Sequence, residues 1–226
     1  CDHQAWSQSF SLHSIYEGLL GLNINAPEKS VKLQPQISFE FNDIKLKNIY
    51  IGDTKMRIKF KREIKGLKVK EKYEMNSQKK LKYSFSPYIA KYSKILSISI
   101  NGRDTGYEKI EKLNTDYLSI NESFGGKSVV VELEYEVPFI LKPIKPKYFP
   151  NSTSNLPRIT GIEKKEDSYE INVEILKSAE IFLITDGDVY VPNTNFTYNM
   201  KNLYIENLSS EDEYVSRKII IKKPQI

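Results

Sequence analysis

Residues able to hold a metal ion or a redox group are scarce in this sequence. Its 226 residues include one cysteine, Cys1, and two histidines, His3 and His13. A single cysteine excludes an intramolecular disulfide and a cysteine-based metal site. On a helix, the two histidines would lie about three turns apart, too far to share one ion. We therefore predict no metal site and no cofactor.

Catalytic signatures and long apolar runs are also missing. The sequence contains no Gly-x-Ser-x-Gly, no His-Glu-x-x-His and no glycine-rich phosphate loop, so we assign no catalytic residue. No run approaches the roughly 18 apolar residues that cross a bilayer, and we expect neither a membrane anchor nor an export signal. Four Asn-x-Ser/Thr sequons leave an extracellular location open beside a cytoplasmic one. They begin at Asn121, Asn151, Asn195 and Asn207.

An amphipathic helix is predicted over residues 4–20. Apolar side chains return there at steps of three and four, the spacing of one helix face. They are Trp6, Phe10, Leu12, Ile15, Tyr16, Leu19 and Leu20. Gly21 fits the left-handed position just past a helix end, and Leu22 can fold back on the last turn. A helix with this apolar stripe needs a packing partner.

The hydrophobic period then changes from about 3.6 to about 2, which indicates strands. Alternating segments between residues 39 and 137 are separated by turn residues such as Asn42-Asp43, Asn76-Ser77 and Asn101-Gly102. Asn-Gly is the strongest short-range signal of a two-residue hairpin turn. We predict an antiparallel β-sandwich over residues 31–137, after a terminal helical segment at residues 1–30.

Proline is concentrated between residues 138 and 158. The positions are Pro138, Pro143, Pro146, Pro150 and Pro157. This density does not suit a sheet interior and is typical of an extended connector, so we predict a linker over residues 138–158. Short alternating segments resume over residues 159–226 and predict a second, smaller sandwich of immunoglobulin-like size. The expected fold class is mainly β, with one N-terminal helix and two sandwiches.

Positive charge is concentrated in one segment. The net charge is +5, and residues 42–82 hold fourteen Lys or Arg against five acidic residues. Cations alternating along strands could follow a phosphate backbone, and Tyr73, Tyr83 and Phe85 could stack bases. A half-buried strand also needs a soluble outer face, and regularly spaced lysines discourage edge pairing. The pattern favours a solvated face over a nucleic-acid groove.

Four short elements near the N-terminus resemble one enzyme family. They are Cys1-x-x-Gln4-Ala5-Trp6-Ser7, Leu20-Gly21-Leu22, Leu33-x-Pro35, and a strand pair marked by Ile44, Leu46, Ile49 and Gly52. Their order and spacing within residues 1–63 are similar to the end of the catalytic domain in amylo-α-1,6-glucosidases and glycogen-debranching-type glycoside hydrolases. The sequence departs from that pattern at His3, where Pro is common, and at residues 35–41. Related (α/α)₆ glycosidases of the glucoamylase kind are therefore kept as an alternative family.

The resemblance implies that residues 1–30 are the end of an (α/α)₆ catalytic barrel. Such enzymes use two carboxylates, which in this family lie upstream of the Gln-Ala-Trp segment. No catalytic role is therefore transferred to Asp2 or Glu17. The resemblance assigns substrate contact to Gln4, Trp6 and His3, although Trp6 also suits a core position between helices.

The implied function is that of the C-terminal, non-catalytic portion of a glycoside hydrolase acting on α-glucans. The expected partners are an α-glucan or oligosaccharide, and a helical barrel or another chain that packs on the N-terminal helix. No membrane partner is expected. The alternative is a non-enzymatic β-sandwich module that binds carbohydrate, nucleic acid or protein, or has a structural role.

Overall fold

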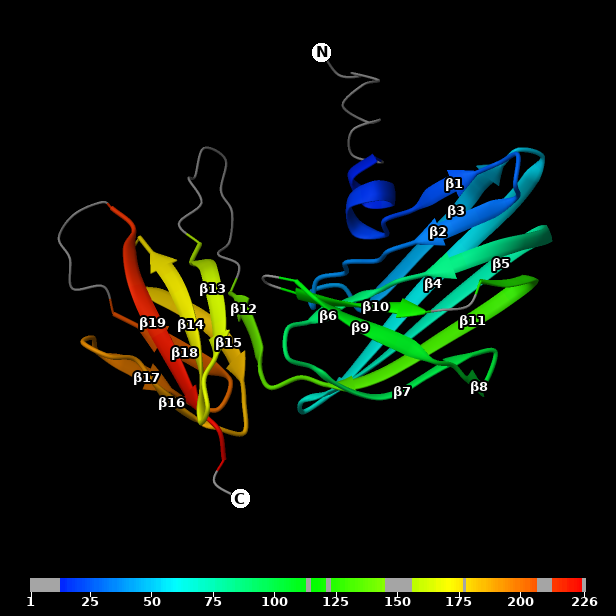
Figure 1. Cartoon of the computed structure of the whole chain (residues 1–226). Helices are drawn as coiled ribbons and strands as arrows, with labels where there is room; N and C mark the ends of the chain where they lie inside the picture. The colour runs from blue at the N-terminus through cyan, green and yellow to red at the C-terminus, as the bar shows by residue number, and fades with distance from the viewer. Residues whose placement is uncertain are drawn as a thin grey trace, which may run out of the picture. The chain divides into compact units, whose positions relative to one another are not determined.

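The computed structural model describes residues 13–112, 115–120, 123–144, 156–176, 178–206 and 213–224. In these residues the protein is mainly β, with nineteen strands and one short helical segment. The mainly β fold class predicted from the sequence is therefore confirmed. The chain divides into two compact units, Cys1–Glu136 and Val137–Ile226 (Figure 1).

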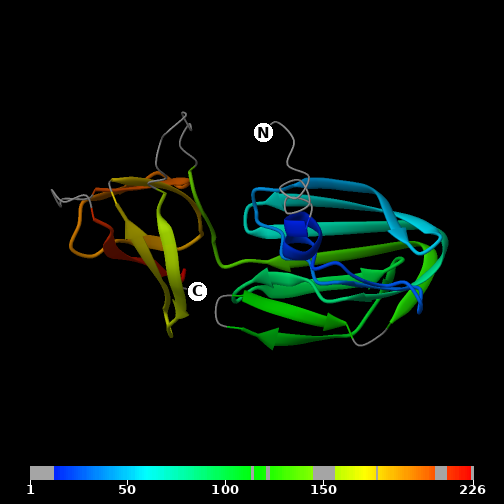
Figure 2. The ribbon, with the colours of Figure 1, turned by 90° about the horizontal axis from the view of Figure 1, so that it is seen from above.

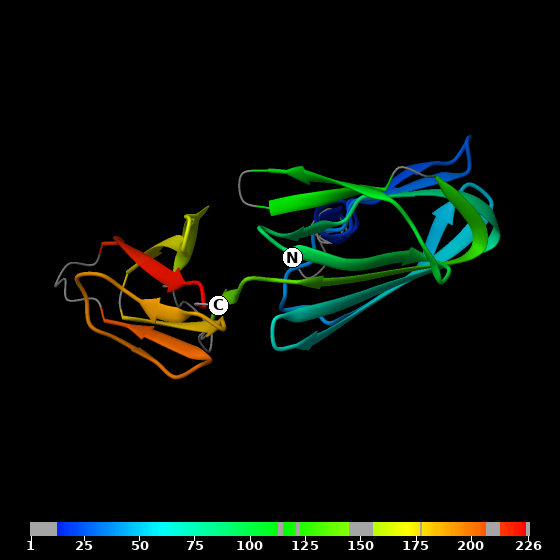
Figure 3. The same ribbon diagram turned by 60° about the horizontal axis from the view of Figure 1, so that its bottom comes forward.

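The first unit contains a large sheet and a small sheet, with eight and three described strands. The large sheet consists of β1 (Asn23–Asn25), β2 (Ser30–Leu33), β3 (Asp43–Ile51), β4 (Thr54–Lys65), β5 (Lys68–Phe85), β7 (Lys94–Ile100), β8 (Arg103–Asp104) and β11 (Phe124–Glu136). The small sheet consists of β6 (Tyr88–Ala90), β9 (Tyr107–Glu111) and β10 (Thr115–Ile120). Figures 2 and 3 show the small sheet and the β3–β4 hairpin on opposite sides of this unit. Alternate side chains of β4, β5 and β11 are buried, so one face of the large sheet forms the core.

Strand β5 is the centre of the large sheet. Its first part pairs with β4 up to Ser77, and its last part pairs in parallel with β2 from Lys82 onward. The turn predicted at Asn76-Ser77 is not formed, because β11 accompanies β5 past this point with a bulge between Gly126 and Ser128. The Ser77 hydroxyl donates to the carbonyl of Lys79 on the same strand at 2.7 Å, and the Lys127 carbonyl of β11 lies 3.3 Å from it. The polar pair therefore marks a bulge within one long strand.

Asn101 and Gly102 form the predicted hairpin turn. Both have positive φ, 51° and 76°, as the two central residues of a type I′ turn require. Ile100 at the end of β7 faces Arg103 at the start of β8. The hairpin predicted from Asn-Gly is confirmed.

The Phe-Glu-Phe alternation at residues 39–41 does not form the strand that it predicts. Arg62 of β4 holds this segment as a loop, because its guanidinium donates to the carbonyls of Ile37 at 2.8 Å, Ser38 at 2.7 Å and Phe41 at 3.2 Å. The carbonyls of adjacent residues point in opposite directions along a strand, so carbonyls that converge on one guanidinium do not fit a β ladder.

Arg62 also forms a buried ion pair with Glu71, which faces it across β4 and β5. The guanidinium Nε and Nη2 lie 2.9 and 2.8 Å from Glu71 Oε1, and the two side chains are 3% and 1% exposed. The hydroxyls of Tyr73 and Tyr135 donate to the same carboxylate, each at 2.8 Å. Burial, together with the charge of Glu71, raises the pKa of both tyrosines well above the usual value. Both hydroxyls therefore stay protonated and able to donate.

A second buried carboxylate, Asp116 of β10, stabilises the small sheet. Lys91 Nζ lies 2.8 Å from its Oδ1, and Lys109 Nζ lies 3.1 Å from its Oδ2. The backbone N–H of Tyr92 also donates to it, at 3.2 Å. Burial alone would raise the pKa of Asp116, but the hydrogen bonds and charges of the two lysines outweigh burial and hold this pKa below its usual value.

The second unit is a sandwich of two four-stranded sheets (Figure 3). One sheet consists of β12 (Ile140–Pro143), β15 (Ala179–Ile184), β18 (Asn202–Ile205) and β17 (Phe196–Tyr198). The other consists of β13 (Arg158–Lys164), β14 (Ser168–Ile175), β19 (Val215–Lys222) and β16 (Asp188–Tyr190). Apolar side chains of both sheets meet in one core, among them Ile171, Val173, Leu183, Leu203 and Ile219.

Part of the predicted proline-rich linker belongs to this sandwich. Residues 140–143 form β12, which pairs antiparallel with β15, and Phe139 and Ile140 are buried. The short apolar run between two prolines supplies this strand, and Pro143 is tolerated because β12 lies at the sheet edge. Residues 145–155 of the predicted linker lie outside the described residues.

The described end of the predicted N-terminal helix is a π-helical segment, η1 (Ser14–Leu19). Its wider winding shows in the hydrogen bond from the Leu20 N–H to the Ile15 carbonyl, at 3.2 Å. Gly21 follows with a φ of 54°, and Leu22 is buried, as predicted for the helix end. Residues 1–12 lie outside the described residues.

We predict that Arg62→Leu lowers the free energy of unfolding of the first unit by about 3–5 kcal/mol, because Glu71 is left charged and buried. Lys59→Leu is the matched control, since Lys59 faces Glu74 across the same two strands. That pair is 3.5 Å apart with side chains 35% and 29% exposed, so its loss costs about 1 kcal/mol or less. Urea unfolding followed by circular dichroism measures both variants. Equal losses would contradict a special role for the buried pair.

We also predict that Asp116→Asn destabilises the first unit at neutral pH, because two lysines lose their buried acceptor. The folded-state pKa of Asp116 is depressed, so its contribution is present above the ordinary carboxyl pKa of about 4 and is lost as the pH falls below it. The difference between wild type and variant is expected to shrink below about pH 4. Urea midpoints from neutral to acidic pH test this. Asp43→Asn, which removes an exposed pair with Lys45, is the control, and a pH-independent difference for Asp116→Asn would refute the assignment.

Candidate functional site

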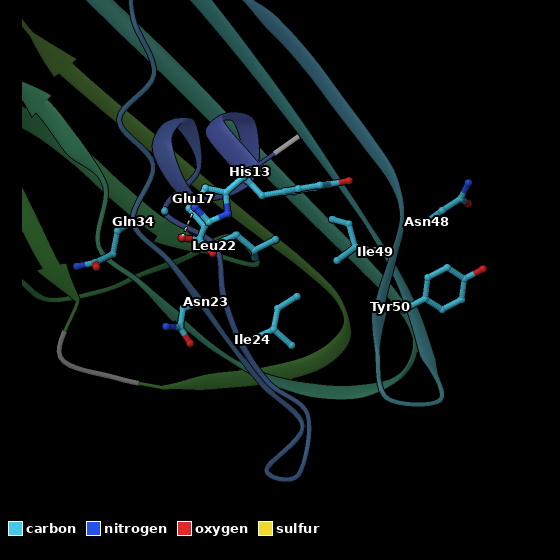
Figure 4. A pocket seen from close by; sticks show the side chains of 11 residues that line it. His13, Glu17, Leu22, Asn23, Ile24, Gln34, Asn48, Ile49 and Tyr50 are labelled. Atoms are coloured by element: carbon cyan, nitrogen blue, oxygen red, sulfur yellow. Dashed lines mark ion pairs between the residues drawn. The ribbon is translucent and has the colours of Figure 1, made fainter. Parts of the chain in front are cut away.

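A cavity of about 710 Å³ lies beside the helical segment. It lies between η1, β1, β3 and the residue that follows β2 (Figure 4). The lining residues are His13, Tyr16, Glu17, Gly21, Leu22, Asn23, Ile24, Gln34, Asn48, Ile49 and Tyr50. Figure 4 shows Asn48, Ile49 and Tyr50 on one side of the opening and Gln34 on the other. We call this cavity the helix-end pocket.

Strand β5 pairs with β4 along its first part and with β2 along its last part, and this change of partner creates the space for the pocket. The hairpins β1–β2 and β3–β4 both pair with the same edge of β5, one after the other along its length. Their outer strands, β1 and β3, each have one described strand neighbour and supply two walls. Near the hairpin turns, Lys79 of β5 forms an ion pair with Asp53. The pocket is therefore a product of sheet topology.

The end of η1 closes the pocket and is tied to the sandwich through its backbone. The N–H of Gln34 donates to the carbonyl of Leu20 at 3.1 Å, and the N–H of Gln36 donates to that of Leu19 at 2.9 Å. Leu20 and Leu22 are 1% and 8% exposed. A Cβ on Gly21 would lie 2.4 Å from the Gln34 carbonyl oxygen, so only glycine permits this approach.

The pocket presents polar amides beside aromatic surface. Tyr50 is 65% exposed, and Asn48 adopts a φ of 61° within the bulge of β3. The exposed side chains of His13 and Glu17 meet with Nε2 and Oε2 3.2 Å apart, drawn as a dashed line in Figure 4. Glu17 is the single carboxylate among the described lining residues. These groups can accept and donate hydrogen bonds and can stack on an apolar ligand face.

The predicted substrate contacts, His3, Gln4 and Trp6, lie outside the described residues. They belong to the predicted helix over residues 4–20. The described end of that helix is η1, which lines the pocket. The sequence argument missed Asn48 and Tyr50. A usable signal was present, because the apolar residues of β3 change from a two-residue to a three-residue step between Leu46 and Ile49, as a bulge requires.

Three aromatic residues that the sequence offered for base stacking are buried, and their burial contradicts that role. Tyr73, Tyr83 and Phe85 are 2%, 1% and 1% exposed and lie on the core face of β5. The alternating lysines of β5, such as Lys68 and Lys70, are exposed on the other face. Aromatic rings and cations therefore do not share one surface there.

Among the described residues, no three His, Cys, Asp or Glu side chains are grouped to hold a metal ion. In the same part of the chain, no helix has the length and apolar character to span a bilayer. Comparisons with protein families, with curated proteins and with solved structures find no match for this chain. The function must follow from the residues of the pocket and from the motifs.

We predict that Gly21→Ala detaches the helix end from the sandwich, because the added Cβ collides with the Gln34 backbone. Gly66→Ala is the matched control, since Gly66 has a φ of 60° but open space around it. The control is expected to cost only the left-handed strain of about 1–2 kcal/mol. Hydrogen exchange at the amides of Gln34 and Gln36 should accelerate in Gly21→Ala and not in Gly66→Ala. Unchanged exchange at both amides would contradict the close approach.

Proposed function

We propose that this chain is the C-terminal, non-catalytic portion of a glycoside hydrolase that acts on α-glucans, of the debranching or glucosidase type. The observation that carries the proposal is the meeting of the motif elements at one place. Gly21 and Leu22 of Leu-Gly-Leu, Gln34 between Leu33 and Pro35, and Ile49 of the strand pair all line the helix-end pocket. Elements that are distant in sequence form one structural unit, which a chance resemblance does not require.

The exposure of η1 supports a helical partner. No residue of Ser14–Leu19 is buried, and Ile15 is 38% exposed. Its far end, in contrast, is joined to the sandwich by the hydrogen bonds at Leu19 and Leu20. In the proposed arrangement, the sandwich supports the end of a catalytic barrel helix, and the exposed side of that helix packs on the barrel.

The pocket chemistry fits binding of a neutral sugar. Tyr50 offers an aromatic face to the apolar side of a pyranose ring, and the amides of Asn23, Gln34 and Asn48 can hydrogen-bond hydroxyl groups. Glycoside hydrolysis uses two carboxylates, whereas Glu17 stands alone among the described lining residues. The proposal therefore places the acid and the base in the upstream catalytic domain and gives this pocket a binding role.

Calorimetric titration with maltoheptaose tests the proposal, with β-linked cellohexaose as the matched sugar of opposite linkage. We predict that the chain binds maltoheptaose more tightly, and that Tyr50→Ala weakens binding about tenfold through loss of one stacked ring. Tyr107→Ala removes another exposed tyrosine of the same unit, 40% exposed and outside the pocket, and should leave binding unchanged.

Two results would overturn the α-glucan assignment. One is equal affinity for the two sugars, and the other is an equal effect of the two tyrosine variants. Glucose release from a branched glucan by the purified chain would contradict the non-catalytic role, because it would require both carboxylates within this sequence.

A non-enzymatic β-sandwich module is the second candidate. The observation that favours it is the second unit, which has its own core formed by both of its sheets. Such a module would bind its ligand without a helical partner. Substitution of exposed Ile15 by Asp distinguishes the two proposals, since it should block association with a helical catalytic domain and leave ligand binding by an independent module intact.

A further inference from the structure

The outer face of the large sheet carries a groove whose positive charge is not balanced. Two neighbouring hollows, of about 590 and 250 Å³, share the residues Lys47, Arg57 and Asn76. The larger one extends from β3 across β4 and β5 to Lys127 and Ser128 of β11, where the register of β5 and β11 shifts. Its lining includes four cations and no carboxylate. The cations are Lys47, Lys55, Arg57 and Lys127. We call the larger hollow the basic groove; the smaller one is also lined by Glu74.

Elsewhere on this face, cations are matched with acids. Lys59 lies 3.5 Å from Glu74, and Lys72 lies 3.5 Å from Glu132. Glu134 faces Lys70 in register. Several cations of the outer face away from the groove therefore have acidic neighbours, an arrangement that needs no ligand.

At the groove the acids are replaced by neutral side chains. Arg57 faces Asn76 across β4 and β5, and Asn76 faces Ser128 across β5 and β11. The Ser128 hydroxyl donates to Asn76 at 3.0 Å. Among the described residues, Arg57 and Lys127 have no carboxylate at ion-pair distance. Cations gathered in a hollow without counter-charge create a field that attracts anions.

The other groups of the groove indicate the kind of anion. Amide and hydroxyl side chains stand beside the cations, and they suit sugar hydroxyls. They are Asn48, Asn76, Ser77, Gln78 and Ser128. No aromatic residue is among the described lining residues, so nucleobases would find no stacking surface. Three strand spacings of about 4.8 Å separate β3 from β11, so the groove spans about 14 Å, enough for several sugar units.

We propose that the basic groove binds an oligosaccharide carrying phosphate or sulfate esters. Tetrahedral oxyanions would accept hydrogen bonds from Arg57, Lys47 and Lys127, and the amides would bind neighbouring hydroxyls. The proposal does not rest on the α-glucan function, because Lys47, Arg57 and Lys127 do not line the helix-end pocket.

Calorimetric titration of the full chain with three forms of maltoheptaose tests this proposal. The forms are sulfated, phosphorylated and unmodified. The substituted forms should bind with an affinity that falls with added salt. The double variant Arg57→Gln/Lys127→Gln should weaken their binding about tenfold or more, through loss of charge-assisted hydrogen bonds. It should leave binding of the unmodified sugar unchanged. A preference for either ester identifies the substituent and supports the proposal.

The matched control is Lys68→Gln/Lys70→Gln, which removes the same charge from exposed positions of the same sheet face outside the groove. An equal loss in this control would show non-specific attraction and overturn the proposal. Tighter binding of single-stranded DNA than of either substituted sugar would replace it with a nucleic-acid groove. Failure of both substituted sugars to bind better than the unmodified one would also overturn it. If circular dichroism shows that the double variant is unfolded, Lys47→Gln alone provides the same test.

Discussion

The desolvated pair of Arg62 and Glu71 is the interaction on which the arrangement of the first unit depends. Removing two charges from water costs several kcal/mol per ion, and only a complete set of partners compensates for this cost. Here the partners come from β4, β5, β11 and the loop before β3. These partners surround the two charges in only one pairing register of β4 and β5. The ion pair therefore favours this register over others that would bury as much apolar area. It also sets where the chain enters β3, and β3 forms a wall of the helix-end pocket.

The two proposed binding surfaces are both products of irregularities in otherwise regular strands. The bulge in β3 turns Asn48 outward, and this residue lines both the helix-end pocket and the basic groove. The bulge opposite Gly126 and Ser128 brings Lys127 to the groove. A perfectly paired sheet would present a flat face of alternating charge, as it does around Lys72 and Glu132. Concave, chemically distinct surfaces arise where that alternation is interrupted.

Local patterns in the sequence were sufficient for long half-buried strands such as β11 and for the turn at Asn101-Gly102, since such strands record burial in alternate residues. The failures have non-local causes. The loop at residues 39–41 depends on Arg62, which lies more than twenty residues away, and the continuity of β5 depends on β11. β12 was not predicted, because the prolines around it indicated a linker. The three-residue step before Ile49 predicts a bulge. No local pattern shows that β1 and η1 lie opposite this bulge. Their position depends on the change of partner along β5, which pairs first with β4 and then with β2.

The parallel pairing of β2 with β5 has a consequence for how the chain assembles. Antiparallel β4 and β5 are joined by a tight turn, so they can meet while the rest of the chain is still extended. β2 cannot pair through a tight turn. Its parallel partner is the last part of β5, which follows the whole β3–β4 hairpin and most of β5 in the sequence. Loop closure over such a distance is favourable only once β5 already exists as a template. The helix-end pocket would then be among the last parts of the first unit to form, since two of its walls wait for that late strand.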